Sequence, residues 1–182
     1  MRLLIGLGNR ARHGKDSAAQ AIQEYARSMN LPETRIFKFA TALYQECEEH
    51  HGMIVKDAPL LQRVGLEKRK LNENYWIDRL KFTIGPFKGI SLITDVRFKN
   101  EAAYIRNAGG FLINVTRLNE DGTPFVAQDR PSDHPSETEL DGYDWDGFIK
   151  TKTGQEALAA EQALTLFNYF LELSKPEQAQ WA

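Results

Sequence analysis

The sequence has few of the features that mark secreted, metal-binding or membrane proteins. Its 182 residues contain one cysteine, Cys47, which excludes an internal disulfide framework and a cysteine-based zinc cluster. No apolar run approaches the roughly 20 residues of a membrane-spanning helix. The N-terminus enters a strand-like run directly and lacks the charged-then-apolar layout of a signal peptide. We therefore expect a cytoplasmic protein with no membrane partner.

A strong charge of either sign is also missing. There are 23 Lys and Arg residues against 25 Asp and Glu residues, which gives a net charge of −2. Such a balance provides no general basic field, so nucleic-acid partners are not expected and any polyanion site must be local. The length suits one domain covering residues 1–182, and we find no repeat or convincing linker.

One stretch near the N-terminus does carry a strong signal. Leu3 to Leu7 is apolar, Gly8 to Gly14 is a basic loop bounded by glycines, and an Ala-rich helical pattern begins at Lys15. This order is typical of the strand, phosphate loop and helix of a P-loop nucleotide site. Glycines let backbone N–H groups face a phosphate, the helix N-terminus favours an anion, and Lys15 can reach the terminal phosphates.

The loop departs from the usual pattern in two ways. Five residues separate Gly8 from Gly14, where four are usual, and Asp16 stands where a Ser or Thr is expected. The hydroxyl comes one place later, at Ser17. An ordinary tight turn between a strand and a helix is the alternative interpretation.

A second signal lies in the middle of the chain. Gly89 to Thr94 forms an apolar strand that ends in Asp95, as in a Walker B element that holds Mg²⁺. A helix is expected over residues 99–108 and a further strand over 111–115, which makes a β-α-β unit. Since ligands lie at the carboxyl ends of parallel strands, Asp95 and the first loop should share one mouth.

The remaining segments predict strands at 35–39 and 145–149, helices at 40–50 and 60–70, and a long C-terminal helix. Residues 116–143 lack regular pattern, and a loop of that length is usually functional, such as a lid, or disordered. Trp76 and Tyr75 fit either a core or a wall on which a base stacks, with Arg69 or Asn72 nearby to read its edge.

Several segments together resemble the phage-type deoxynucleoside monophosphate kinases. They are residues 11–17 (ARHGKDS), 61–65 (LQRVG) with Tyr75-Trp76, 94–102 (TDVRFKNEA) and 134–141 (HPSETELD). The resemblance implies a P-loop kinase fold, which is an α/β three-layer α/β/α sandwich with a mainly parallel sheet and a lid at 116–143. It also implies transfer of the γ-phosphoryl group of ATP to a deoxynucleoside monophosphate.

On this interpretation each candidate residue has a role. Binding of ATP is assigned to Gly8, Arg12, Gly14, Lys15, Asp16 and Ser17, and the Mg²⁺ cofactor to Ser17 and Asp95, with Asp16 as an alternative ligand or an orienter of the acceptor. The groups expected to act in catalysis are Lys15, Arg12, Asp16, Arg97 and Arg130. Substrate binding is assigned to Arg69, Tyr75, Trp76, Asp95, Arg97, Arg117, His134 and Glu137. Glu101 is expected to pair with Arg97 at helical spacing.

Two other functions stay open at this point. One is a P-loop kinase that acts on another small metabolite, and the other is a non-catalytic ATP-binding regulatory module. The sequence leaves open the preferred base, the discrimination between ribose and deoxyribose, and whether the chain forms a homodimer.

Overall fold

The apolar run near the N-terminus forms the central strand of a parallel sheet. The structure is a computed structural model that describes residues 2–175. The strand order is β2-β3-β1-β4-β5, and all four pairings are parallel. The strands are β1 (Leu3–Gly8), β2 (Thr34–Phe37), β3 (Ile90–Val96), β4 (Phe111–Leu118) and β5 (Gly147–Lys152). Because every strand runs the same way, their carboxyl ends meet at one edge of the sheet.

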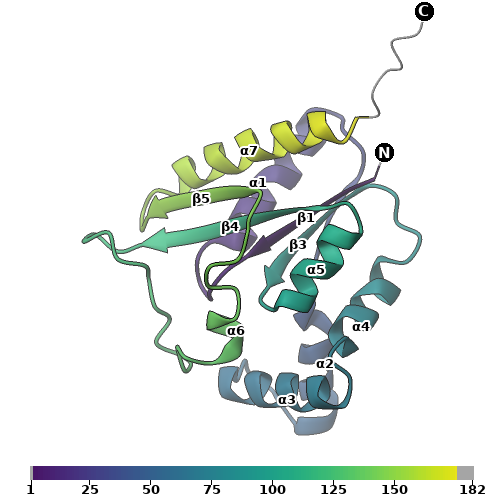
Figure 1. The fold of residues 1–182 in the computed structure, drawn as a ribbon, viewed down its shortest axis with the longest axis vertical. Coiled ribbons are helices and arrows are strands. Elements are labelled where there is room, and N and C mark those ends of the chain that lie inside the picture. Colours follow the sequence, from purple (N-terminus) through teal and green to yellow (C-terminus); the bar gives the residue numbers. More distant parts are fainter. Residues whose placement is uncertain (1, 176–182) are drawn as a thin grey trace, which may run out of the picture.

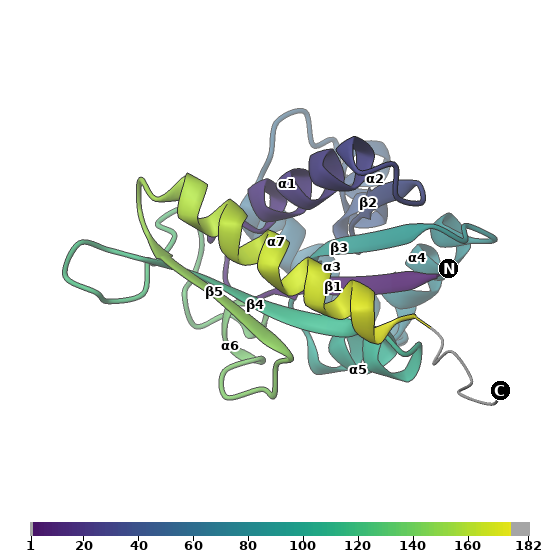
Figure 2. The same cartoon turned by 90° about the horizontal axis from the view of Figure 1, so that it is seen from above.

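Helices cover both faces of this sheet, as Figures 1 and 2 show. On one face α1 (Lys15–Ser28) and α7 (Glu156–Leu173) enclose a core with β1 and β4. On the other face α4 (Tyr75–Ile84) and α5 (Lys99–Asn107) pack around Trp76, Ile93 and Leu112. The predicted three-layer α/β/α fold is confirmed.

Two further helices extend the molecule beside β2. They are α2 (Ala40–His51) and α3 (Ala58–Leu71), and a small cluster of buried residues around Cys47 and Val64 holds them together. Asp57 caps α3, since its side chain accepts the Leu60 N–H at 2.9 Å. These helices form the lower part of Figure 1, where they lie near the short helix α6 (Pro135–Thr138).

Two predicted strands have shifted boundaries. β4 runs on to Leu118, because its polar end continues to pair with β5 as far as Lys152. β5 begins at Gly147 rather than Trp145, since the Trp145 ring packs in the core against β1. The predicted lid therefore begins inside a strand, and it contains α6 near its end.

Within residues 2–175, no helix combines the length and apolar character needed to cross a membrane.

Candidate active site

The carboxyl ends of the strands open into a cavity of about 580 Å³ with the loop between β1 and α1 at its centre. On one side of the loop the cavity is bordered by Arg117, Thr151 and Gln155, from β4, β5 and the start of α7. On the other side it is bordered by α2, α3 and α5, with Leu43, Arg69 and Phe98 in the wall. The cavity lining thus extends from the loop to elements on both sides of β1.

The loop presents a helix N-terminus to this cavity. Gly14 caps α1 with φ of 89°, in the left-handed region that suits glycine, and the space that a β-carbon would occupy is open. Lys15 follows it and is only 6% exposed; its Nζ donates to the carbonyl oxygens of Asn9 and Arg10 at 3.2 and 2.5 Å. Burial and the nearby Arg97 lower the pKa of the Lys15 ammonium. An anion at this position would offset both effects.

The longer spacing of the loop has a structural explanation. Asn9 and Arg12 both adopt positive φ, 99° and 61°, so two residues of the loop before Gly14 have a left-handed backbone conformation. The Asn9 amide donates to Asn114 Oδ1, the Val115 carbonyl oxygen and Thr116 Oγ1, at 3.1, 3.2 and 2.7 Å. The start of the longer loop is therefore tied to β4 through Asn9. Gly8 lies outside the cavity lining, and its missing side chain makes room for the Trp145 ring.

Asp16 points to a second lysine that the sequence patterns did not single out. Its Oδ1 accepts the Thr94 hydroxyl at 2.6 Å and lies 2.8 Å from Lys38 Nζ. Partial burial raises the pKa of the Asp16 carboxyl, but the hydrogen bonds from Lys38 and Thr94 outweigh this effect and lower it overall. Lys38 follows β2 directly and lines the cavity. The feature of the sequence that could have identified Lys38 is its position directly after a parallel strand.

Asp95 stands at the end of β3 as predicted, but its carboxylate has a structural task. Its two oxygens accept the N–H groups of Phe39 and Ala40 at 2.9 and 2.8 Å, which satisfies the start of α2. Burial raises the pKa of this carboxyl despite these hydrogen bonds. A carboxylate has about four lone-pair sites, so Asp95 retains acceptor capacity toward the cavity. Together with Ser17 it offers the oxygen ligands that suit Mg²⁺.

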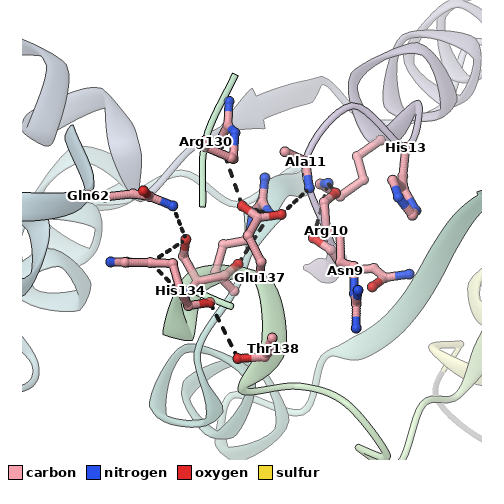
Figure 3. A network of polar contacts seen from close by, with 12 residues as sticks. Asn9, Arg10, Ala11, His13, Gln62, Arg130, His134, Glu137 and Thr138 are labelled. Atoms are coloured by element: carbon pink, nitrogen blue, oxygen red, sulfur yellow. Dashed lines mark hydrogen bonds and ion pairs between the residues drawn. The ribbon is translucent and has the colours of Figure 1, made fainter. Parts of the chain in front are cut away.

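Glu137, on α6, is the centre of a network that includes the loop (Figure 3). Its Oε2 accepts the Ala11 N–H at 2.8 Å, and its Oε1 lies 3.1 Å from Arg97 Nη1 and 3.7 Å from Arg130 Nη1. His134 caps α6 through Nδ1, which accepts the Ser136 N–H at 3.1 Å. The network brings two of the predicted catalytic residues together on one carboxylate: Arg97, which directly follows β3, and Arg130 of the lid.

Arg12 reaches from the loop toward the lid instead of into the loop's concave side. Its Nη2 lies 2.7 Å from Asp129 Oδ2, and its side chain is 57% exposed. Asp129 also pairs with Arg130, at 3.1 Å. These two arginines hold the pKa of the Asp129 carboxyl well below its usual range. The lid is thus tied to the phosphate loop by the ion pair of Arg12 with Asp129 and by the hydrogen bond from the Ala11 N–H to Glu137.

A further contact joins the loop to β4 on the first side of the cavity. The His13 ring is 4% exposed; its Nε2 lies 2.9 Å from the Phe125 carbonyl oxygen and its Nδ1 accepts the Arg117 N–H at 3.3 Å. Since a carbonyl oxygen can only accept, Nε2 carries the proton. The Arg117 guanidinium lies 3.5 Å from the centre of the Phe125 ring. His13 was not predicted as a site residue; only its place in the loop could have indicated it.

The cavity wall on the side of α2, α3 and α5 contains a buried ion pair. Arg69 Nη2 lies 2.5 Å from Glu101 Oε1, and the guanidinium stacks 3.8 Å from the centre of the Phe98 ring. Glu101 Oε2 accepts the N–H groups of Arg97 and Phe98. The expected pairing of the Glu101 and Arg97 side chains is therefore wrong, because Glu101 contacts only the backbone of Arg97 while its side-chain partner comes from α3.

The two predicted aromatic residues differ in position. Trp76 is 2% exposed and its Nε1 donates to the Gly65 carbonyl oxygen at 3.1 Å, so it is a core residue that backs the cavity wall. Tyr75 packs edge-on against it and lies outside the lining. The cavity lining unites the other predicted residues: Arg12, Gly14, Lys15, Asp16, Ser17, Arg69, Asp95, Arg97, Arg117, Arg130, His134 and Glu137.

Comparison with solved structures supports the fold assignment. Shikimate kinase from Acinetobacter baumannii superposes with a TM-score of 0.55 and 12% identity, covering 97% of each chain. The APS kinase CysC of Mycobacterium tuberculosis, in a structure with AMPPNP and APS, superposes with a TM-score of 0.51 and 11% identity, covering 94% of this chain and 98% of that one. The chain has the fold of P-loop kinases.

Comparison of sequences is more limited. No family profile matches the chain. A protein of Acanthamoeba polyphaga mimivirus named "Putative deoxynucleotide monophosphate kinase" is 47% identical over 49 residues, which are 27% of this chain. The match spans about a fifth of that relative, 21% of its length.

Proposed function

We propose that the chain is an ATP-dependent kinase that transfers the γ-phosphoryl group of ATP to a deoxynucleoside monophosphate. The observation that carries this proposal is the single cavity that is lined by the phosphate loop and by elements on both sides of it, β4 and β5 on one and α2, α3 and α5 on the other. A donor and an acceptor that meet at one loop need this arrangement. The similarity to the mimivirus protein supports a deoxynucleotide as acceptor.

The donor would lie on the side of β4 and β5. Its phosphates would occupy the concave side of the loop, where Lys15 and the start of α1 supply positive charge. Its base would lie toward Arg117 and Gln155. Lys15 now donates to two carbonyl oxygens of its own loop, and phosphate oxygens would replace these acceptors.

The acceptor would lie on the side of α2, α3 and α5. An oxygen of its phosphate attacks the γ-phosphorus, a new P–O bond forms, and the bond to the bridging oxygen breaks so that ADP leaves. The attacking oxygen is already anionic, so the reaction needs no strong base. It needs charge compensation and alignment. Lys15, Arg97 and Arg130 supply the charge, and Lys38 adds a further cation at this side.

Ser17 and Asp95 would hold a Mg²⁺ ion beside the donor phosphates. When bound, Mg²⁺ would offset the negative charge of the donor phosphates. The residues of the lid would exclude water from the cavity, which limits loss of ATP by hydrolysis.

A coupled assay of ADP formation tests the proposal. The enzyme is given ATP and Mg²⁺ together with one acceptor at a time: dAMP, dGMP, dCMP, dTMP or one of the four ribonucleoside monophosphates. We expect ADP to form rapidly with at least one monophosphate and slowly without any. The diphosphate product is identified by chromatography.

Two controls define the outcome. Lys15→Met should abolish turnover, and Lys81→Met should not, since Lys81 lies on α4 outside the cavity lining and pairs with Asp78. Wild-type protein that binds ATP but turns over with none of the monophosphates would contradict the nucleotide-kinase proposal and favour another small metabolite as acceptor. ATP binding without turnover on any acceptor would indicate a regulatory module.

A further inference from the structure

The carboxylate of Glu137 joins segments that lie far apart in the chain. It is 7% exposed, and Figure 3 shows it between Ala11 of the phosphate loop and Arg130. We propose that Glu137 is a positioning residue, which fixes the loop at Ala11 and holds Arg97 and Arg130 toward the acceptor phosphate. This inference rests on the proposed kinase function and assigns Glu137 a task other than substrate binding.

The contacts of Glu137 leave it poorly suited to touch the substrate. Oε2 accepts a hydrogen bond from the Ala11 N–H at 2.8 Å. Oε1 accepts one from Arg97 Nη1 at 3.1 Å and lies 3.7 Å from Arg130 Nη1. Both oxygens therefore already face donors inside the protein. A phosphate in the cavity would be repelled by a carboxylate but attracted by the two guanidinium groups. Glu137 acts through its neighbours.

Three cations lie around Glu137. Arg97 and Arg130 converge on one carboxylate oxygen, and the charges of Arg97 and Glu137 both act on Lys15. Asp129 also pairs with Arg130, so the cations are partly neutralised and are held together where an anionic acceptor could contact them. Each guanidinium has five N–H donors, so neither arginine is exhausted by its contact with Glu137. Without the carboxylate, the three cations would repel one another and separate.

Surrounding contacts hold α6 in the orientation that this task requires. The Glu137 N–H donates to the His134 carbonyl oxygen at 2.7 Å, and Gln62 of α3 donates to the Ser136 hydroxyl at 3.4 Å. Glu139 accepts the Lys99 N–H at 2.8 Å, which joins α6 to α5. Glu137 is thus supported by contacts of its segment with both α3 and α5, as expected for a residue that sets the distance between loop and arginines.

The test compares Glu137→Gln with Glu139→Gln. Both changes remove one carboxylate from the end of the lid, but only Glu137 contacts the loop and the two arginines. Gln at 137 can still accept the Ala11 N–H, yet it has no charge to hold two guanidinium groups. We expect kcat to fall about tenfold and the KM of the acceptor to rise about tenfold, because misplaced groups lose alignment. The KM of ATP should change far less, and Glu139→Gln should match wild type.

A second measurement does not depend on turnover. Glu137→Ala removes the acceptor of the Ala11 N–H, so hydrogen exchange of residues 9–14 should accelerate at least about tenfold over wild type and Glu139→Gln. If wild type turns over no monophosphate but this exchange accelerates, the proposed function has failed and the link from Glu137 to the loop stands. Unchanged exchange, or kinetic losses in Glu137→Gln that equal the loss of folded protein in a thermal melt, would overturn the positioning role.

Discussion

Nε2 of His13 lies 2.9 Å from the carbonyl oxygen of Phe125, 112 residues later in the chain. With Nδ1 accepting the Arg117 N–H, both ring nitrogens are occupied and the ring must stay neutral. Burial lowers the pKa of the His13 ring from 6.5 to about 4. The phosphate loop is therefore joined to β4 by a residue that binds a proton readily only after unfolding.

This relationship predicts a loss of stability in mild acid. The unfolded chain binds a proton at His13 below about pH 6.5, while the folded chain does so only near pH 4, so His13 reduces the free energy of unfolding as pH falls through this window. The loss should reach roughly 3 kcal/mol and then level off. His13→Gln removes the titration. Urea unfolding of both proteins at pH 4.5, 5.5 and 7.5 measures the difference, in which other groups cancel; a difference independent of pH would contradict the prediction.

Lys15→Met should reduce kcat by about 100-fold or more, because a buried ammonium that offsets phosphate charge acts mainly in the transition state. The substitution removes the two bonds of the ammonium to loop carbonyl oxygens, but the hydrogen bonds of the Asn9 and His13 side chains and of the Ala11 N–H remain, so the fold should persist. Steady-state kinetics and a thermal melt check both statements. Near-normal turnover in this variant would remove the loop from the mechanism.

The sequence predicted those parts of the site that depend on local pattern. The apolar strand, the glycines and the helix that starts at Lys15 are neighbours in the chain, and Asp95 stands at the end of an apolar strand. Parallel topology then brings both to one edge of the sheet. No contact between distant segments had to be known for this inference.

The rest of the site depends on long-range contacts that leave no local trace. Glu137 and Ala11 are 126 residues apart, and their hydrogen bond arises only once α6 packs near α3. The side-chain partner of Glu101 was predicted wrongly for the same reason. Arg97 has helical spacing to it, but the Arg69 side chain of α3 occupies the position beside its carboxylate. Strand β4 was predicted too short, because pairing with β5 compensates for its polar end.

Lys38→Met should weaken transfer without unfolding the protein. The ion pair between Lys38 and Asp16 is about half exposed, so its loss should cost at most about 1 kcal/mol of stability. If Lys38 leaves Asp16 to bind a phosphate, kcat/KM for the acceptor should fall roughly 10- to 100-fold. Lys81→Met, which also breaks a surface ion pair, is the matched control. Equal kinetics for the two variants would show that Lys38 only balances the charge of Asp16.

The ion pair of Arg69 and Glu101 is buried, so removing one partner alone should lower the free energy of unfolding substantially. Glu101 is 1% exposed, and it receives Arg69 Nη2 at 2.5 Å together with two backbone N–H groups. Glu101→Leu leaves the Arg69 guanidinium buried without its carboxylate, which should cost about 3–5 kcal/mol in the free energy of unfolding.

Replacing both partners should restore much of this loss. In the double variant Arg69→Met, Glu101→Leu neither charge of this pair remains, and a Met side chain can still pack on the Phe98 ring. Chemical denaturation of wild type, both single variants and the double variant gives the coupling energy, which should be at least about 1.5 kcal/mol. Additive effects of the two substitutions would mean that the ion pair contributes no coupling. Since Arg69 lines the acceptor side of the cavity, the restored double variant should nevertheless bind the acceptor less tightly than wild type.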